Sequence, residues 1–152
     1  MTNVKAIYFD MDGTIADLYG DEQWLEKLRA YNPEPYIKAR PLVNMSRLAR
    51  YLNKLQKRGV KIGVISWLSK CSTPAYDVAV AKAKAEWLER HLKSVKFDEI
   101  KIVSHGLKKS AVVEEQSHSI LFDDEMNNRV EWTTETRTAY SPARIFEILA
   151  KI

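Results

Sequence analysis

The chain has 152 residues, of which 45% are hydrophobic and 29% are charged, a composition typical of a globular protein with one buried core. No apolar run approaches the roughly 20 residues needed to cross a bilayer, and the first residues lack the pattern of a signal peptide. A single cysteine, Cys71, excludes an internal disulfide, so these features together predict a cytoplasmic protein with no membrane partner. The net charge of +4 mildly favours phosphorylated or polyanionic partners.

Strand and helix patterns alternate through the first half of the chain. Residues 4–9 are a short apolar run rich in β-branched and aromatic side chains, which predicts a buried strand. Apolar residues at helical spacing predict a helix over 21–31, and the three prolines of residues 32–41 predict an irregular stretch. A second helix is expected over 45–57, and the apolar run 60–66 predicts a second buried strand.

A long helix is predicted over residues 74–92, because Thr73 and Pro74 supply a capping hydroxyl and a proline in the first turn. The residues expected on its inward face are Val78, Ala81, Ala85, Leu88 and Leu92. The remaining predicted elements are a strand at 99–104, a short helix at about 109–116, strands at 119–122 and 137–140, and a last helix after Ser141 and Pro142.

Strands that read as apolar runs and alternate with helices indicate a mostly parallel sheet covered on both faces. The predicted fold is therefore α/β, a Rossmann-like three-layer α/β/α arrangement. In such folds the functional site lies beyond the carboxyl ends of the strands. Polar side chains occur at those points: Asp10 and Asp12 after the first strand, Ser66 after the second, His105, Lys108 and Lys109 after the third, and Asp123 and Asp124 after the fourth.

The carboxylates of this set predict a metal site. Asp10 and Asp12 are two residues apart in an extended segment, so both can face one small volume, and Gly13 allows a sharp turn after them. Asp123 and Asp124 arrive from another strand, and so many converging carboxylates require a cation. Oxygen-rich sites of this kind suit Mg²⁺, which also binds substrate phosphate. The alternative is a simple Asp-Gly turn at the end of a strand.

These residues, in this order, resemble the haloacid dehalogenase (HAD) superfamily of phosphohydrolases. The first motif of that family, DxDGT, stands here as residues 10–14, and the second, a Ser or Thr that ends an apolar strand, corresponds to Ser66. The lysine of the third motif corresponds to Lys108 or Lys109, and the acidic pair of the fourth to residues 123–124. The resemblance covers nearly the whole chain and implies a single HAD-like catalytic domain over residues 1–152.

The resemblance also implies a mechanism and a metal. Asp10 would attack phosphorus and form an aspartyl-phosphate, and Asp12 would protonate the leaving group and then deprotonate the hydrolytic water. Mg²⁺ would be held by Asp10, by the backbone carbonyl of Asp12 and by Asp123, with Asp124 bound directly or through water. Because the dehalogenating members lack the second aspartate of the first motif, Asp12 favours phosphoryl transfer.

The phosphate ligands implied by the resemblance are Ser66 and one lysine. Lys109 is preferred over Lys108, because Lys109 and Ser110 read as the opening of a helix that would aim the lysine at the site. Asn127 stands where many relatives carry a further site residue, although it could equally cap a helix. His105 could border the pocket or lie on the surface.

Room for a cap exists only at about residues 18–41, so the site should be rather open, of the capless or minimally capped type. Some such relatives resemble 5′(3′)-deoxyribonucleotidases. The aromatic residues Trp24, Tyr31, Tyr36 and Trp67 could stack a nucleobase, which makes a nucleotide the favoured small phosphorylated substrate. Alternatively, Trp24 and Tyr31 only pack the small helix against the core.

Two further functions stay open. An open site admits polynucleotide ends or phosphoproteins, and a helix with basic residues could contact nucleic-acid phosphates, although a solvated helix face explains them equally well; these residues are Arg47, Arg50, Lys54, Lys57 and Arg58. A binding protein that kept the HAD fold without catalysis is the other alternative. The intact set of Asp10, Asp12 and Asp123 argues against it.

Overall fold

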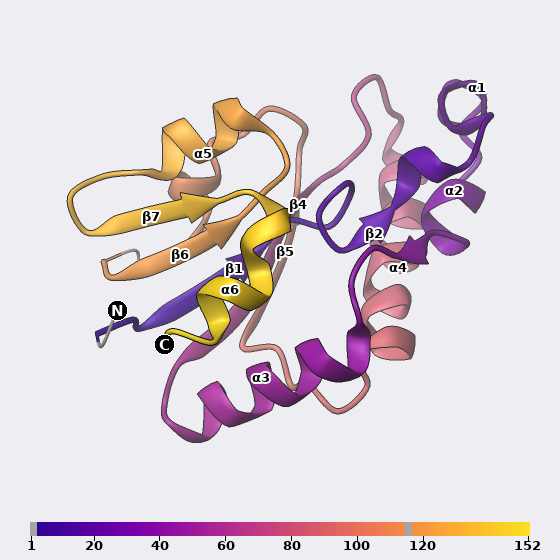
Figure 1. Ribbon diagram of the computed structural model, residues 1–152. Coiled ribbons are helices and arrows are strands. Elements are labelled where there is room, and N and C mark those ends of the chain that lie inside the picture. The colour runs from indigo at the N-terminus through magenta and orange to yellow at the C-terminus, as the bar shows by residue number, and fades with distance from the viewer. Residues whose placement is uncertain (1–2, 115–116) are drawn as a thin grey trace.

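A five-stranded sheet forms the centre of the molecule. The computed structural model describes residues 3–114 and 117–152 (Figure 1). The strands are β1 (Ala6–Phe9), β4 (Lys61–Trp67), β5 (Glu99–Val103), β6 (Ser119–Phe122) and β7 (Arg137–Tyr140). They all run parallel in the order β5-β4-β1-β6-β7, so the predicted α/β fold with a parallel sheet is confirmed.

Helices cover the sheet on both faces, which gives the three layers. Helices α3 (Met45–Lys57), α4 (Pro74–His91) and α6 (Ile145–Leu149) lie on one face, and α5 (Met126–Trp132) lies on the other (Figure 1). Successive side chains of a strand point to opposite faces. Accordingly, Ile7 and Phe9 of β1 belong to the core cluster under α3, whereas Tyr8 packs edge-on against Trp132 of α5, with ring centroids 5.6 Å apart.

Helix α3 shows how local sequence produces one of these layers. The Asn44 side chain caps its first turn by accepting a hydrogen bond from the Arg47 amide, at 2.9 Å. Leu48, Leu52 and Leu55 recur at helical spacing and are buried against the sheet. Truncating one such leucine to alanine costs about 2–5 kcal/mol. The helix predicted over 45–57 is confirmed.

Several short elements were not predicted or have other bounds. Helix α5 was missed, because it is short and few of its residues are apolar. The segments expected as a helix over 21–31 and an irregular stretch over 32–41 contain α1 (Trp24–Arg29), α2 (Glu34–Ile37) and β3 (Arg40–Pro41), which pairs with β2 (Ala16–Asp17). Three 3₁₀ turns complete the chain: η1 (Leu18–Gly20), η2 (Lys109–Val112) and η3 (Pro142–Arg144). The helix expected over 109–116 is thus only the turn η2, and residues 115–116 lie outside the described residues.

The predicted inward face of α4 was wrong for three of its residues. Val78 is 70% exposed, Ala85 is exposed and Ala81 is only partly buried. Leu88 and Leu92 are buried as predicted, and the other buried side chains of α4 are Tyr76, Val80, Ala83, Lys84 and Trp87. Both stripes have helical spacing, and the true one contains a lysine that an apolar pattern cannot include. Although α4 is 18 residues long, neither it nor any other helix in the described parts of the chain is apolar enough to span a membrane.

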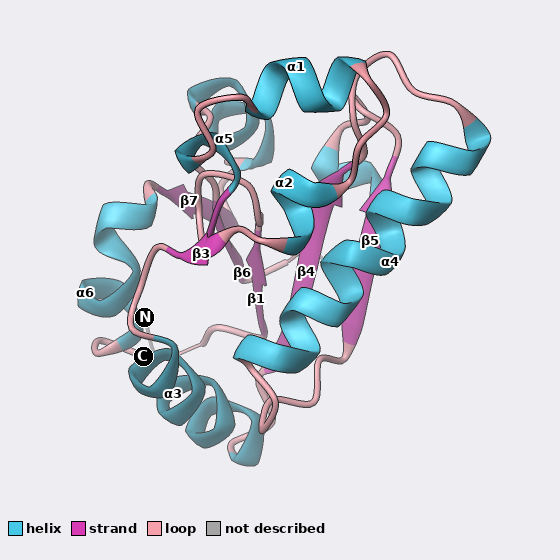
Figure 2. Cartoon of the chain, turned by 90° about the vertical axis from the view of Figure 1, so that its right-hand side faces the viewer, coloured by secondary structure: helices cyan, strands magenta, loops and turns pink. Residues whose placement is uncertain are grey.

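The segment from η1 to β3 is fastened to α4. The Tyr76 hydroxyl donates to the Asn32 carbonyl at 2.9 Å, and the Trp87 indole donates to the Ala39 carbonyl at 2.8 Å. Arg90 donates to the Ile37 carbonyl at 2.8 Å. These bonds satisfy backbone carbonyls of the segment and fix α2 beside α4, and α1 packs on α2 near the carboxyl ends of β1 and β4 (Figure 2).

Candidate active site

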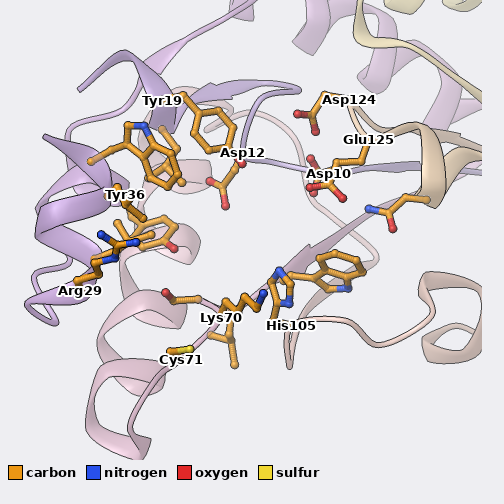
Figure 3. A pocket seen from close by; sticks show the side chains of 18 of the residues that line it. Asp10, Asp12, Tyr19, Arg29, Tyr36, Lys70, Cys71, His105, Asp124 and Glu125 are labelled. Carbon is orange, nitrogen blue, oxygen red and sulfur yellow. The ribbon is translucent and has the colours of Figure 1, made fainter. Parts of the chain in front are cut away.

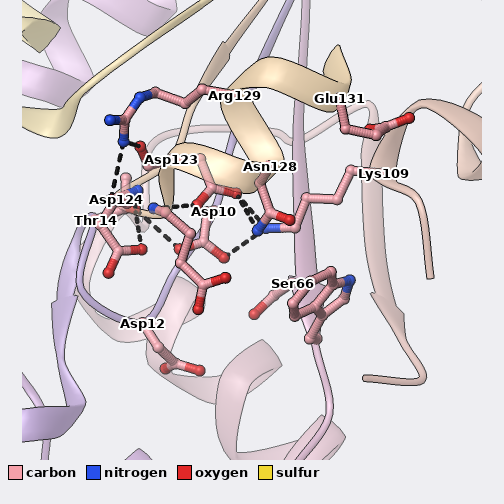
Figure 4. Close-up of polar contacts among 12 residues, drawn as sticks. Asp10, Asp12, Thr14, Ser66, Lys109, Asp123, Asp124, Asn128, Arg129 and Glu131 are labelled. Atoms are coloured by element: carbon pink, nitrogen blue, oxygen red, sulfur yellow. Dashed lines mark hydrogen bonds and ion pairs between the residues drawn. The ribbon is translucent and has the colours of Figure 1, made fainter. Parts of the chain in front are cut away.

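The carboxyl ends of two neighbouring strands, β1 and β6, bring the acidic residues together. β1 lies between β4 and β6, and Phe9 pairs with both Val64 and Phe122. The ladder continues one residue further, because the Asp10 amide donates to the Phe122 carbonyl at 2.9 Å. Asp123, the residue after β6, therefore stands beside Asp10 at the edge of the sheet (Figure 4).

A tight turn after β1 shapes this edge. The amides of Thr14, Ile15 and Ala16 all donate to the Met11 carbonyl, and Gly13 has a φ of +80°, a conformation that favours glycine. A Cβ at Gly13 would overlap the Asp124 carboxylate. The Thr14 hydroxyl donates to Asp10 Oδ2 at 2.9 Å and accepts from the Asp124 amide at 3.1 Å. The turn thus ties the first acidic segment to the second.

Three carboxylates converge closely enough to hold one cation. One oxygen from each of Asp10, Asp123 and Asp124 lies within 4.8 Å of the other two. Donors around them fix their orientation, since Asn128 donates to Asp123 Oδ2 at 3.1 Å and Arg129 donates to the carbonyls of both Asp123 and Asp124. An all-oxygen set of carboxylates fits a hard divalent cation of the Mg²⁺ type.

Lys109 offsets part of the negative charge. Its side chain is 1% exposed, and its ammonium lies 2.7 Å from Asp10 Oδ1 and 2.7 Å from Asp123 Oδ2. Burial alone would lower the pKa of Lys109, but these two carboxylates raise it above the ordinary value, so the side chain stays charged. Lys108, the alternative third-motif lysine, is exposed.

Asp12 belongs to a second buried ion pair, which the sequence did not predict. Its Oδ2 lies 2.8 Å from the ammonium of Lys84, from α4. The same ammonium donates to Ser66 Oγ at 2.6 Å and to the Trp67 carbonyl at 2.7 Å. Burial raises the pKa of Asp12 above its ordinary value, although Lys84 acts in the opposite direction. Ser66 is fully buried beside this lysine.

These groups together form what we call the charge network: Asp10, Asp12, Asp123, Asp124, Lys84 and Lys109. Four carboxylates face two ammonium groups, which leaves an excess of negative charge at neutral pH. In line with this excess, partial burial and the nearby charge of Asp10 raise the pKa of the Asp124 carboxyl to about 7. A divalent cation would balance the network.

The charge network opens into a pocket of about 550 Å³ (Figure 3). Asp10, Asp12, Asp123 and Asp124 line its acidic end. The lining also includes what we call the aromatic rim: Tyr19, Trp24, Tyr36, Trp67 and His105. Tyr19 and Trp24 contact each other edge-on with ring centroids 4.9 Å apart, and the rings of Trp67 and His105 are 4.8 Å apart. The volume and the mixed lining are those of a small-molecule site.

The sequence-predicted residues fall into two groups. Asp10, Asp12, Asp123, Asp124 and His105 line the pocket, whereas Ser66 and Lys109 lie buried behind that lining. Sequence reasoning missed Lys84, and it singled out Asn127 where the structure brings Asn128 to Asp123 and leaves Asn127 exposed. A shift of one residue on a short, unpredicted helix accounts for the second miss.

Several solved structures have a fold similar to that of this chain. The chain is similar to D,D-heptose 1,7-bisphosphate phosphatase from Burkholderia thailandensis, with a TM-score of 0.57 and 13% identity over 96% of this chain and 99% of that one. It is also similar to a candidate HAD-like phosphatase from Mesorhizobium loti, with a TM-score of 0.56 and 12% identity over 97% of this chain and 85% of that one. A HAD family enzyme from Bacteroides thetaiotaomicron gives a TM-score of 0.52 and 7% identity over 91% of this chain and 93% of that one.

These likenesses show the fold. The chain has the α/β fold of HAD proteins over almost its whole length, with its pocket at the carboxyl ends of the parallel strands. No protein-family model matches the chain, and no curated protein sequence does. The site's own geometry must therefore carry the functional argument.

Proposed function

We propose that this protein is a Mg²⁺-dependent phosphatase that hydrolyses a phosphate monoester through an aspartyl-phosphate on Asp10. The observation that carries the proposal is the convergence of Asp10, Asp123 and Asp124 beside a buried lysine, at the end of a pocket large enough for a small phosphorylated molecule. The phosphatases among the proteins of similar fold support it. Three carboxylates in one spot are otherwise unfavourable.

The metal would be held by Asp10, by the backbone carbonyl of Asp12 and by Asp123, with Asp124 bound directly or through water. When bound, Mg²⁺ offsets the charge of the carboxylates and of the phosphate, which allows one anion to approach another. The described side chains supply only oxygen ligands at this point, as this cation prefers.

We assign the remaining roles to the residues of the four motifs. A carboxylate oxygen of Asp10 attacks phosphorus, and the bond from phosphorus to the leaving oxygen breaks. Asp12 gives a proton to that oxygen and later takes one from the water that cleaves the aspartyl-phosphate. Lys109 and Ser66 bind phosphoryl oxygens in this proposal. Because an ammonium is only a donor, Ser66 Oγ accepts from Lys84 and keeps its own proton for a phosphate oxygen.

The aromatic rim favours a nucleotide as the substrate. Tyr19, Trp24 and Tyr36 come from the segment at residues 18–41, which we propose acts as a minimal cap over the acidic end. A base could stack on these rings while its phosphate reaches Asp10. None of the four basic residues of α3 lines the pocket, nor does Arg58 after it, and Arg47 instead packs over Phe146, 4.2 Å from the ring centroid. This placement favours a small molecule over a polynucleotide end.

The test is phosphate release from a substrate panel, with MgCl₂ and with chelator. The panel holds an aryl phosphate, 5′- and 3′-nucleotides, a sugar phosphate, a sugar bisphosphate and a 3′-phosphorylated oligonucleotide. We expect turnover that requires Mg²⁺ and that falls by about 10⁴-fold or more in Asp10→Asn, the variant without its nucleophile. Normal turnover by folded Asp10→Asn would refute the mechanism, and silence of the wild type across the panel would refute the activity.

A further inference from the structure

Lys84 is a second buried lysine at the site, and it lies outside the four motifs that the sequence revealed. Its side chain is 1% exposed, and it pairs with Asp12, which lies 72 residues earlier in the sequence. The ammonium has three hydrogen-bond partners, namely Asp12 Oδ2, Ser66 Oγ and the Trp67 carbonyl. It also lies 5.1 Å from the centre of the Tyr36 ring. All three of its protons are therefore used.

A purely structural role explains only two of these partners. The bonds to Ser66 and Trp67 fasten α4 to the end of β4, and an apolar side chain of similar volume would do this at lower cost in desolvation. The third bond goes to Asp12, whose side chain lines the pocket. A buried charge that holds a pocket carboxylate fits a role in the reaction.

The two lysines of the charge network serve different aspartates. Lys109 contacts Asp10 and Asp123, the proposed nucleophile and a proposed metal ligand. Lys84 contacts Asp12, the proposed proton donor. Because Lys84 donates to Oδ2 of Asp12, its positive charge disfavours a proton on that oxygen and favours one on Oδ1, and the bond to Oδ2 orients the carboxyl group.

The geometry points to Lys84 as a positioning residue that aims Asp12 Oδ1 at the leaving group, an inference that rests on the proposed phosphatase function. In the first step Asp10 bonds to phosphorus, and the electron pair of the broken bond stays on the leaving oxygen. That oxygen takes the proton from Asp12. In the second step water attacks phosphorus, gives a proton to Asp12 and releases phosphate from Asp10.

The test compares two substrates of similar shape that differ in their need for a proton. The leaving group of 4-nitrophenyl phosphate is a stable phenolate anion. The leaving group of benzyl phosphate is a strongly basic alkoxide, so its departure depends on the general acid. The value of kcat/KM for each reports only the steps up to departure of the leaving group. We expect Lys84→Met to lower kcat/KM for benzyl phosphate at least about tenfold more than for 4-nitrophenyl phosphate.

Lys82→Met is the matched control, because Lys82 lies on the same helix with a side chain that is 73% exposed. We expect it to leave both values unchanged within about twofold. Lys84→Arg keeps the charge and should recover part of the benzyl phosphate activity. An equal loss on both substrates in Lys84→Met would show that the lysine acts on the fold or on phosphate binding, and would overturn the inference.

A double variant keeps the test valid if Lys84→Met folds poorly because Asp12 is left unpaired. In Asp12→Asn the acid is already absent, so adding Lys84→Met should lower benzyl alcohol release in a single turnover by less than about threefold. A multiplicative further loss would overturn the inference. If the wild type turns over neither substrate with Mg²⁺, the proposed function fails and this inference fails with it.

Discussion

The charge network and the aromatic rim of the pocket are held in place by different interactions. The network joins residues that follow β1 and β6 to Lys84 of α4 and Lys109 of η2 through buried ion pairs. Three rings of the rim belong to residues 18–41, a segment whose backbone carbonyls accept from Tyr76, Trp87 and Arg90 of α4. The other two, Trp67 and His105, lie at and just after the ends of β4 and β5, and all five rings line the pocket.

Because of this difference, we expect changes in the charge network to alter the rate of the chemistry and changes in the aromatic rim to alter substrate specificity. Removing a lysine of the network leaves carboxylates without their counter-charge in or beside the interior, so both the chemistry and the fold are affected. Removing one ring of the rim leaves the backbone bonds to α4 intact, so the effect should fall on substrate binding.

Lys109→Met should be the most damaging of these changes. It removes the ammonium between Asp10 and Asp123, so two carboxylates face each other in the interior. We expect turnover to fall by about 10²–10³-fold and the free energy of unfolding without metal to fall by about 3–5 kcal/mol. Urea denaturation should show that MgCl₂ restores part of the stability, because a divalent cation offsets the same two charges.

The control for this prediction is Lys108→Met, which removes an exposed lysine one residue earlier. It should change stability by less than about 0.5 kcal/mol and leave turnover intact. If both variants lost activity equally, the buried ion pairs would not be what sets the rate, and the proposed distinction between network and rim would collapse.

The sequence predicted those parts of the molecule that depend on local patterns. Apolar runs located the five strands, and the polar residues that follow them located Asp10, Asp12, Asp123 and Asp124 at one edge of the sheet. Parallel strands place their carboxyl ends together, so this part needed no knowledge of packing.

Lys84 could not be predicted in the same way. A lysine in a helix is expected on the solvent face, and only the tertiary contact with Asp12 makes its burial favourable. The stripe with Val78 looked more apolar than the true stripe, which is why the predicted face of α4 was rotated. The pocket was also unpredictable, since it depends on how residues 18–41 attach to α4.

Trp24→Ala should affect specificity and leave chemistry unchanged. Trp24 lines the pocket at the start of α1 and touches Tyr19. We expect kcat/KM for a nucleoside 5′-monophosphate to fall by about tenfold, through a higher KM, because base stacking is worth roughly 1–3 kcal/mol. The value for ribose 5-phosphate, which lacks the base, should stay within about twofold.

Ile37→Ala is the control for the rim, because Ile37 belongs to the same segment, is exposed and does not line the pocket. It should leave unchanged the ratio of the kcat/KM values for the nucleoside 5′-monophosphate and ribose 5-phosphate. An equal loss on both substrates in Trp24→Ala would mean that Trp24 supports the fold of the segment and does not contact a base.

The smallest effect concerns protons and metal at Asp124. Its folded pKa of about 7 is raised mainly by partial burial and by Asp10, so between its ordinary pKa and about pH 7 the folded protein holds a proton that the unfolded chain has released. In metal-free protein this contribution to stability is present at low pH and is lost as the pH rises through 7. Mg²⁺ must displace that proton, so the rise in melting temperature on adding MgCl₂ should grow from about pH 5 to pH 7 and then level off. Asp124→Asn should flatten this profile, whereas a wild-type profile already flat over that range would show that Asp124 does not couple to the metal.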